Sequence, residues 1–408
     1  MKQVPGGICA AKGFSAAGLR AGIKPTSPAD KNDLGLIVSS VPCAAAGVFT
    51  TNRVKAAPVW LDKEQLADGT AQVIIANSSI ANACAPEGEE TCRKEMALVS
   101  DALDVKASDV LVSSTGVIGV RLNVEAIEAA LPELVSKLDG SAEGSDAVAR
   151  AIMTTDTVKK EISFEFEVGG KTAHIGGISK GSGMIHPRMG TMLCYLTTDA
   201  CASAEMLDKA LREVVGRTFN RISVDGDMST NDTCIILANG LAENPCIATE
   251  GEDYEALKAA MYEVCLYLCR LMAQDGEGAT HLMTCKVAGT ASEADAEVLG
   301  KSVINSSLTK AAIFGADANW GRVLCAIGYS GADLDVNKVD VAFKSAKGSL
   351  PVCKNGAGVD FSEEFAKEVL LEKEITILVE LNSGSAGATA WGCDLTYDYV
   401  KINGDYRS

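Results

Sequence analysis

The segment from Lys180 to Leu193 contains the residues whose types and spacing best suggest chemistry. Lys180 opens a glycine-rich stretch that ends at Gly190, and Thr191 begins a short apolar run. Because glycine has no side chain, the Thr191 hydroxyl can approach the preceding carbonyl carbon, and the backbone can adopt the strained geometry that such an attack needs. The pattern therefore predicts self-cleavage between Gly190 and Thr191, with an ordinary turn into a strand as the simpler alternative.

Cleavage at this point would give Thr191 a second reactive group. A free α-amine titrates near ~8, so its neutral form can take the proton of the neighbouring hydroxyl at physiological pH. The chain has only three histidines, His174, His186 and His281, so a base other than imidazole suits it. A phosphate-binding loop is a further alternative, but its sixth position is His186 where glycine is needed, and no acidic residue follows at the ribose spacing.

The composition limits the class of protein. At 408 residues, with 47% hydrophobic and 22% charged residues, the chain is globular and long enough for a large composite core or several domains. Its net charge of −17 argues against sequence-independent binding of nucleic acid and against an anionic membrane surface. No apolar run approaches the ~20 residues of a membrane-spanning helix, and the N-terminus lacks the apolar core of a secretory signal.

The fourteen cysteines are scattered along the chain without a C-x-x-C motif. Such usage is typical of reduced, mostly buried thiols, so we expect a cytoplasmic protein. Cys265 and Cys269 share a helical face but have no histidine nearby in the sequence. We interpret them as core residues and expect no metal site.

Hydrophobic periodicity predicts mixed strands and helices that would position these groups. The strands are expected at 34–38, 71–75, 163–168, 172–175, 192–196, 234–237 and 374–380, with another beginning at Asp109. The helices are expected at 123–137, 147–153 and 254–273, with two more capped by Ser203 and Ser292. Pro132 should split or kink the first helix, residues 140–144 should form a polar break, and the aromatic-rich ending at 388–408 should be docked.

Polar loops follow several of the expected strands. Thr115 and Gly116 lie where a buried strand breaks, and exposed backbone N–H groups there can stabilise an oxyanion. Residues 77–82 form either a ligand loop or a simple turn. Residues 225–233 carry alternating oxygens but lack the glycine and glutamate of an EF-hand calcium loop. Glu277, between two glycines, either faces a ligand or is a solvated turn carboxylate.

Short motifs of small and polar residues recur along nearly the whole chain. They are residues 47–52, 113–116, 153–156, 180–185, 191–193, 224–227, 229–233, 275–280, 319–322 and 399–403. In this order they resemble the ornithine acetyltransferase family of arginine biosynthesis, the ArgJ type. The resemblance is specific because so many motifs follow one another in the same sequence.

The resemblance implies an acetyltransferase that moves the acetyl group of N2-acetylornithine to glutamate through an acetyl-threonine intermediate on Thr191. It also implies an α chain, 1–190, and a β chain, 191–408, which share one composite core and assemble as α2β2. The implied partners are these chains and the small-molecule substrates N-acetylornithine and glutamate, with no nucleic acid, membrane or cofactor. Use of acetyl-CoA as a co-substrate stays open. An N-terminal-nucleophile amidohydrolase or aminopeptidase is the alternative.

The resemblance further implies roles for individual residues. Thr191 is the nucleophile, and Thr115 with Gly116 forms the oxyanion hole. The residues implied to contact substrate are Thr154, Lys180, Thr191, Glu277, Asn403 and Ser408. Thr155 is an alternative to its neighbour Thr154.

The implied fold is α/β, or α+β, with a smaller second α/β domain. Its main part is a DmpA/ArgJ-like α-β-β-α sandwich, which resembles N-terminal-nucleophile hydrolases in architecture but not in topology. The chain departs from the family pattern at a few positions. Gly190 stands where Ala is common, and Ser408 where Thr is common. Ser79 and Ile80 replace a Gly and an Asn, which puts a positive-φ conformation in doubt there.

Overall fold

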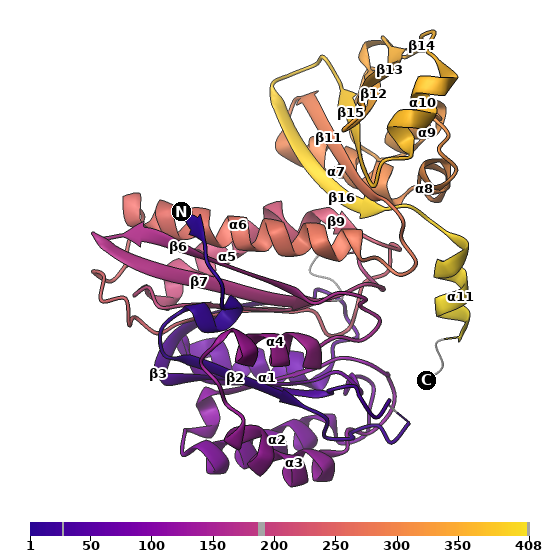
Figure 1. The fold of residues 1–408 in the computed structure, drawn as a ribbon. Coiled ribbons are helices and arrows are strands. Elements are labelled where there is room, and N and C mark those ends of the chain that lie inside the picture. The colour runs from indigo at the N-terminus through magenta and orange to yellow at the C-terminus, as the bar shows by residue number, and fades with distance from the viewer. Residues whose placement is uncertain (27, 187–191, 406–408) are drawn as a thin grey trace. The chain divides into compact units, whose positions relative to one another are not determined.

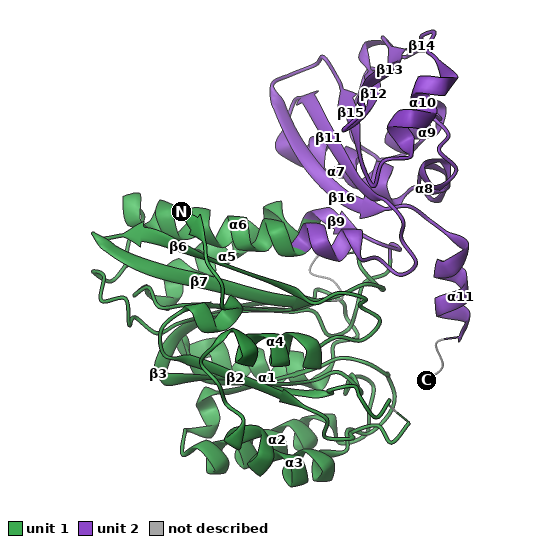
Figure 2. Ribbon diagram, viewed as in Figure 1, with its two compact units in different colours: residues 1–220, 227–268, 408 green, residues 221–226, 269–407 purple. Residues whose placement is uncertain are grey.

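The computed structural model describes residues 1–26, 28–186 and 192–405. The chain divides into two compact units, which Figure 2 shows in different colours. Unit 1 consists of Met1–Asn220 and Asp227–Leu268, and unit 2 consists of Arg221–Gly226 and Cys269–Arg407. The expected cleavage residues Gly190 and Thr191, and the expected substrate contact Ser408, lie outside the described residues.

Unit 1 contains a nine-stranded sheet in the order β1-β6-β7-β8-β10-β3-β4-β5, with β2 also paired to β3. In this spatial order, followed by β2, the strands are β1 Lys2–Gln3, β6 Lys160–Val168, β7 Lys171–Lys180, β8 Leu193–Thr198, β10 Thr233–Ala238, β3 Leu34–Phe49, β4 Thr70–Asn77, β5 Val110–Ser114 and β2 Phe14–Leu19. The long β3 joins the two halves of the sheet. Its first part pairs with β2 and β4, its last part pairs with β10, and its register with β4 shifts between Val38 and Cys43.

The two halves of this sheet stack face to face. One core cluster combines Ile37 and Leu111 from β3 and β5 with Ile178 and Tyr195 from β7 and β8. The alternate residues of β3, β4 and β5, which point to the opposite face, form a second cluster with helical side chains. Strands buried on both faces read as continuous apolar runs, which explains the runs seen in the sequence.

Helices cover the outer faces of the stack. Figure 1 shows α2 and α3 at one end of unit 1 and α5 and α6 at the other, with the strands between them. The helices are α1 Ala57–Gln65, α2 Gly88–Leu103, α3 Val124–Ser136, α4 Ala142–Ala151, α5 Ala204–Arg217 and α6 Glu252–Gln274. The expected α-β-β-α sandwich is therefore confirmed. No helix in the described part of the chain is long and apolar enough to span a membrane.

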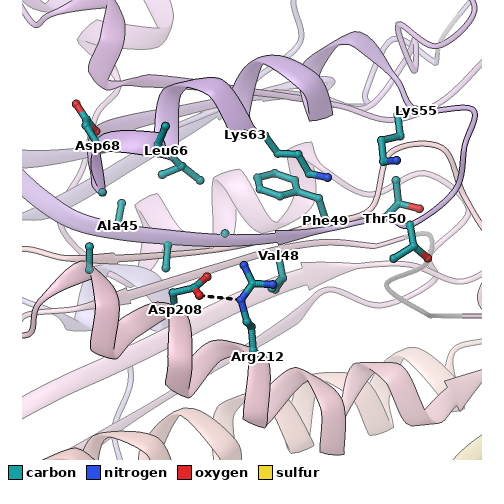
Figure 3. Close-up of a pocket in the computed structure, with 16 residues that line it drawn as sticks. Ala45, Val48, Phe49, Thr50, Lys55, Lys63, Leu66, Asp68, Asp208 and Arg212 are labelled. Carbon is teal, nitrogen blue, oxygen red and sulfur yellow. Dashed lines mark hydrogen bonds and ion pairs between the residues drawn. The ribbon is translucent and has the colours of Figure 1, made fainter. Parts of the chain in front are cut away.

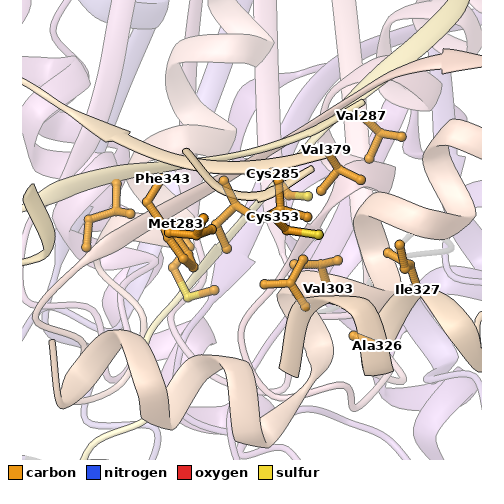
Figure 4. Packing of buried hydrophobic residues seen from close by; sticks show 14 of the residues in the cluster. Met283, Cys285, Val287, Val303, Ala326, Ile327, Phe343, Cys353 and Val379 are labelled. Carbon is orange, nitrogen blue, oxygen red and sulfur yellow. The ribbon is translucent and has the colours of Figure 1, made fainter. Parts of the chain in front are cut away.

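Unit 2 is a smaller α/β body, as expected. Its seven-stranded sheet has the order β14-β13-β12-β15-β11-β16-β9. The strands are β9 Ile222–Ser223, β11 Leu282–Thr290, β12 Asp340–Ser345, β13 Gly348–Lys354, β14 Ala357–Gly358, β15 Glu374–Glu380 and β16 Ala386–Cys393. The helices are α7 Glu293–Asn305, α8 Ser307–Phe314, α9 Trp320–Gly328, α10 Glu363–Leu370 and α11 Tyr397–Asp405. Alternate β11 residues (Met283, Cys285 and Val287) pack against the helices in one apolar core (Figure 4).

Several helix predictions agree with the structure, and others need correction. The side chains of Ser203 and Ser292 accept the N-cap hydrogen bonds of α5 and α7, as expected. Helix α3 runs through Pro132 without splitting, so the predicted split is wrong. The predicted polar break at 140–144 instead begins α4, because Ser141 caps that helix and accepts a hydrogen bond from Glu143 N.

The expectation that residues 388–408 are docked holds only in part. Strand β16 lies in the sheet of unit 2, where it pairs with β11. None of the residues of α11 is buried, and the side chains of Tyr397 and Val400 are 84% and 68% exposed. Aromatic content at the end of the chain was therefore a poor guide to burial.

Candidate active site

Lys180 lies at the end of the interior strand β7 and is almost fully buried, at 3% exposure. Its Nζ donates a long hydrogen bond of 3.4 Å to Oγ1 of Thr115, the residue that follows β5. Strands β5 and β7 are not neighbours in the sheet, so this contact exists only because the two halves stack. Burial lowers the pKa of Lys180, while the negative charge of Asp156 opposes that shift.

Asp156 holds the surroundings of Lys180 in place. Its Oδ1 accepts hydrogen bonds from Lys160 Nζ and from Gly181 N, both at 2.7 Å. The Asp156–Lys160 ion pair is completely buried. Burial alone would raise the pKa of Asp156, but the charges of Lys160 and Lys180 and the two hydrogen bonds outweigh it and lower the pKa to about 2. The carboxylate is therefore a stable structural anion at neutral pH.

The same carboxylate fixes the segment that carries Thr154. Oδ2 of Asp156 accepts from Thr154 N at 3.0 Å, and the carbonyl oxygen of Thr154 accepts from Lys31 Nζ at 3.2 Å. The backbone of Thr154 is thus tied to the residues that hold Lys180 and Gly181. Both Thr154 and Thr155 are partly exposed, so the assignment of the substrate contact to Thr154 stays a prediction.

The turn at Thr115 and Gly116 differs in one respect from the sequence expectation. The backbone N–H of Thr115 donates to the carbonyl oxygen of Asn77 at 2.9 Å, so this N–H is not an exposed oxyanion donor. Among the described residues, the N–H of Gly116 has no acceptor. The donors left at this turn are therefore the Gly116 N–H and the Thr115 hydroxyl.

Gly116 is required by the shape of this turn. Its φ is +126°, and an added Cβ would lie 2.2 Å from the carbonyl oxygen of Ser79. The loop that makes this close approach is held by Asn77, whose Oδ1 accepts from Ser79 N and Ile80 N. Residues 77–82 thus support the turn at Gly116.

Ser79 and Ile80 do not adopt the positive φ that the family pattern suggested for their positions. Neither has a positive φ, and the left-handed residues of this loop are Asn82 and Cys84. Ser79 instead donates from its hydroxyl to the buried carboxylate of Asp33 at 3.3 Å. The departures from the family pattern are therefore accommodated without backbone strain at those two positions.

The polar loop 229–233 reaches the same region from another direction. Asn231 Nδ2 donates to the carbonyl oxygens of Ala81 and Ser114, at 2.6 and 2.7 Å. Asp232 is fully buried, and its Oδ1 accepts from the backbone N–H of Met192 at 2.8 Å. This loop therefore connects the end of β5 to the start of β8.

The remaining expected site residues lie in unit 2. Asn403 Nδ2, on α11, donates to Glu277 Oε2 at 2.7 Å and to Tyr399 O at 3.1 Å. Glu277 thus has a defined partner in unit 2. The structure brings together Thr115, Gly116, Thr154 and Lys180 in unit 1, and Glu277 with Asn403 in unit 2, as two separately described groups.

A hollow of about 770 Å³ opens in unit 1 between β3, α1 and α5 (Figure 3). It is lined by three cationic side chains, Lys55, Lys63 and Arg212, and by two carboxylates, Asp68 and Asp208. Arg212 Nε donates to Asp208 Oδ2 at 2.7 Å (Figure 3). The ammonium of Lys63 lies 5.6 Å from the centre of the Phe49 ring. Partial burial, and then the charges of Lys55 and Arg212, lower the pKa of Lys63. With Arg212 paired to Asp208, the cations of the hollow that have no carboxylate partner among the described residues are Lys55 and Lys63.

Two of the three histidines are paired with buried carboxylates. His174 Nδ1 lies 3.1 Å from Asp199 Oδ2, and His281 Nδ1 lies 2.9 Å from Asp394 Oδ2. In the described part of the chain, neither histidine has a serine or threonine hydroxyl bonded to its other ring nitrogen. A Ser-His-Asp arrangement is therefore not formed by these two residues.

Sequence reasoning missed the residues that support this site. Asp156, Asn231 and Asp232 all belong to quoted motifs, yet none was assigned a role. The available signal was the density of polar residues directly before or after buried strands, which turns and binding loops share. Lys160 gave no signal at all, because a lysine at the start of a strand is usually exposed.

Known proteins with similar sequences cover the whole chain. The family whose sequence model matches is described as the ArgJ family, over residues 15–408. An "arginine biosynthesis bifunctional protein ArgJ" from Caldanaerobacter subterraneus subsp. tengcongensis is 51% identical over 409 residues, with 100% of both chains covered. The protein of that name from Bacillus subtilis is 43% identical, covering 100% of this chain and 98% of its own.

A solved structure with a similar sequence is the ornithine acetyltransferase of Mycobacterium tuberculosis, complexed with ornithine. It is 38% identical, covers 46% of this chain and 96% of its own chain, and has a TM-score of 0.41.

Proposed function

Because this chain belongs to the ArgJ family, we propose that it transfers the acetyl group of N2-acetylornithine to glutamate in arginine biosynthesis. The relatives that cover the full chain are named arginine biosynthesis bifunctional proteins. The observation that best supports this chemistry is the contact between buried Lys180 and the Thr115 hydroxyl, beside the unbonded N–H of Gly116. It combines a cation with two donors, as acyl transfer requires.

The nucleophile of the proposed reaction is Thr191, freed by cleavage after Gly190. Its α-amine takes the proton of its own hydroxyl, and the hydroxyl oxygen attacks the acetyl carbonyl of N2-acetylornithine. Ornithine leaves and acetyl-Thr191 remains. The amine of glutamate then attacks this ester, and N-acetylglutamate departs.

The oxyanion of each tetrahedral intermediate would meet the Gly116 N–H and the Thr115 hydroxyl. Lys180 already donates to Thr115 Oγ1, so the hydroxyl proton is directed away from Lys180 and is available to the oxyanion. The ammonium also strengthens this donor, since a hydroxyl oxygen that accepts a hydrogen bond from a cation has a more acidic O–H. Each such donor is typically worth about 3–4 kcal/mol to the transition state.

Charges would orient the substrates. Both substrates carry an α-carboxylate, and Lys180 is a buried cation that can attract it strongly at low local dielectric. Glu277 would meet the side-chain ammonium of ornithine, with Asn403 fixing the carboxylate. Thr154, Thr191 and Ser408 complete the proposed set of substrate contacts.

We further propose that the α chain, 1–190, and the β chain, 191–408, remain together as α2β2 in the cytoplasm. The core of unit 1 supports continued association, because it packs Ile178 on one side of the cleavage point against Leu193 and Tyr195 on the other. Size-exclusion chromatography with light scattering would test the assembly.

Acetyl transfer from labelled N2-acetylornithine to glutamate tests the main proposal. We expect labelled N-acetylglutamate and a transient acetyl group on the peptide that begins with Thr191. Release of labelled acetate without N-acetylglutamate would instead identify the alternative, an amidohydrolase. Denaturing mass spectrometry of the same sample should show two fragments in place of one chain of 42.4 kDa.

A second activity, with acetyl-CoA as donor, is favoured by the two lysines of the hollow. Lys55 and Lys63 would meet the phosphates of coenzyme A, whereas Arg212 is already paired with Asp208. Thr50 lines the same hollow and donates from its N–H to the carbonyl oxygen of Asp232, the residue bonded to Met192. The hollow therefore ends close to the start of β8.

Kinetics with the two donors test this second activity. The double variant Lys55→Ala/Lys63→Ala should raise KM for acetyl-CoA without changing KM for N2-acetylornithine. Lys94→Ala, an exposed lysine on α2 outside the hollow, is the matched control. Equal KM values for acetyl-CoA in all three proteins, or no acetyl-CoA activity in the wild type, would reject the proposal.

A further inference from the structure

Self-cleavage and acetyl transfer cannot use the same base. Before cleavage, the nitrogen of Thr191 belongs to a peptide bond, and its lone pair is delocalised into the carbonyl group. Such a nitrogen cannot accept the proton of the Thr191 hydroxyl. The precursor therefore needs a different base, close to Thr191, that is already present in the uncleaved chain.

Asp232 is held next to this position by the sheet. Strands β8 and β10 are parallel, and their register pairs Leu193 with Thr233. Asp232 and Met192 are the residues directly before this pair. Thr233 N donates to Met192 O at 3.0 Å, and Asp232 Oδ1 accepts from Met192 N at 2.8 Å. The carboxyl group is thus fixed to the residue that immediately follows Thr191.

One oxygen of this carboxyl group makes no hydrogen bond to the part of the chain that the structure describes. Asp232 is 0% exposed, and its Oδ2 has no hydrogen-bond partner among the described residues. An unpartnered buried acceptor is costly, typically by about 1–3 kcal/mol, so a partner is expected. The carbonyl carbon of Thr191 is covalently bonded to Met192 N, the atom that donates to Oδ1.

The electrostatic environment suits a proton acceptor. Burial raises the pKa of Asp232 to about 8, against the hydrogen bond from Met192 N, the neighbouring Thr50 hydroxyl and the positive charge of Lys180 on β7. A carboxyl group with a raised pKa is a stronger base than an ordinary carboxylate, and a base works best when its pKa lies near the working pH.

We propose that Asp232 is the base that removes the proton from the Thr191 hydroxyl during self-cleavage. The inference rests on the proposed function, since it assumes cleavage after Gly190. It concerns a different reaction, however, because it assigns the base of cleavage and not that of acetyl transfer.

The steps balance without any added reagent except water. Asp232 Oδ2 takes the hydroxyl proton while Thr191 Oγ1 bonds to the carbonyl carbon of Gly190. The C–N bond between Gly190 and Thr191 then breaks, and Asp232 returns the proton to the departing nitrogen. Water hydrolyses the resulting ester, which leaves a carboxylate on Gly190 and restores the Thr191 hydroxyl beside a free amine.

The test is the rate at which freshly made full-length precursor is converted to two fragments, followed by denaturing mass spectrometry. Removing a general base typically slows a reaction by about 10²–10⁴-fold, so Asp232→Asn should slow cleavage at least about 100-fold. The wild-type rate should rise with pH and level off near the pKa of this group, and the remaining rate of Asp232→Asn should lose that dependence.

Asp62→Asn is the matched control. Asp62 is also a buried aspartate of unit 1 with a raised pKa, one oxygen bonded to a backbone N–H (Val112) and the other unpartnered. It should cleave at the wild-type rate. Circular dichroism and melting temperature check that both variants fold, and Asp232→Glu, which keeps the carboxyl group, should recover part of the rate if Asp232→Asn does not fold.

Cleavage of folded Asp232→Asn at the wild-type rate, or equal slowing in Asp62→Asn, would overturn the inference. So would an unchanged pH dependence in a folded Asp232→Asn, or no cleavage at any pH in a folded Asp232→Glu. The proposed function fails separately, if wild-type protein transfers no acetyl group or remains a single chain while active.

Discussion

The ammonium nitrogen of Lys180 lies 3.4 Å from the hydroxyl oxygen of Thr115, although 65 residues separate them in the chain. The contact joins the end of β7 to the end of β5, on opposite halves of the stacked sheet. Because the backbone N–H of Thr115 is bonded to Asn77 O, the hydroxyl is the group of this residue that the proposed reaction would use. The predictions below depend on this contact and on the residues that hold it.

Removing the hydroxyl should weaken the chemical step. We expect Thr115→Val to lower kcat for acetyl transfer by about 10²–10³-fold with little change in KM, because the donor acts on the transition state. Thr115→Ser, which keeps the hydroxyl, should retain most of the rate. Steady-state kinetics decide this, and equal rates for the two variants would contradict the assignment.

The turn at Gly116 should tolerate no side chain. Gly116→Ala would place a Cβ 2.2 Å from Ser79 O at φ +126°, so we expect a loss of about 1–3 kcal/mol in the free energy of unfolding from backbone strain, and more from the clash. Gly119→Ala is the control, since Gly119 also has a positive φ (+80°) but no atom within 4 Å of the added Cβ. Urea unfolding should rank Gly116→Ala clearly below Gly119→Ala.

Asp156 should contribute stability that depends on pH. Folding lowers its pKa from 3.8 to about 2. A lowered carboxyl pKa stabilises the fold fully above the unfolded value, and this stabilisation is lost as the pH falls from ~4 to ~2. About two pKa units correspond to roughly 2–3 kcal/mol. Urea unfolding at pH 6 and pH 3 should show about half of this loss in the wild type, because pH 3 lies between the two pKa values, and a smaller loss in Asp156→Asn.

Removing one partner of the buried Asp156–Lys160 ion pair should lower the free energy of unfolding more than removing both partners. Asp156→Asn leaves Lys160 without its carboxylate, and a change of this kind typically destabilises by about 3–5 kcal/mol. The double variant Asp156→Asn/Lys160→Met removes both charges and should regain part of that loss. Denaturant unfolding of the wild type, Asp156→Asn, Lys160→Met and the double variant measures the difference, and additive losses would show that the pair is not coupled.

Glu277 should affect only one of the two substrates. If it meets the side-chain ammonium of ornithine, Glu277→Gln should raise KM for N2-acetylornithine about tenfold or more, in line with the loss of a charge-assisted hydrogen bond. KM for glutamate, which lacks that ammonium, should change little. Asn403→Ala, which removes the amide that bonds Glu277 Oε2, should give the same pattern in a weaker form. Equal effects on both substrates would exclude this role.

The local elements were largely predictable from the sequence. Continuous apolar runs placed β10 within one residue at each end, because a strand buried on both faces has little choice of side chain. The caps at Ser203 and Ser292 were also found, since capping depends on neighbours in the chain. The sandwich itself came from the resemblance, because no local rule says which strands stack.

The site was less predictable, because its contacts join distant segments. Asn231 bonds Ser114 across 117 residues, and Asp156 feels the charge of Lys180 because β6 and β7 pair in the sheet. Even the exposed N–H inferred at Thr115 proved to be bonded to Asn77, since β4 and β5 run in parallel and bring that carbonyl within reach. The density of polar residues in the sequence identified the loops of the site. It did not show which backbone and side-chain groups of those loops already have hydrogen-bond partners.

The antiparallel pairing of β7 with β8 places Lys180 opposite Leu193, so the sheet itself spans the proposed cut. Cleavage of the peptide bond would leave the pairing of β7 with β8 in place, but it would change the products of unfolding. The precursor melts into one molecule, whereas the processed enzyme would melt into separate polypeptides, and its midpoint would rise with protein concentration. Dilute processed enzyme would then refold only as fast as its pieces meet, so the fold would be assembled once, as a single chain, and only afterwards divided.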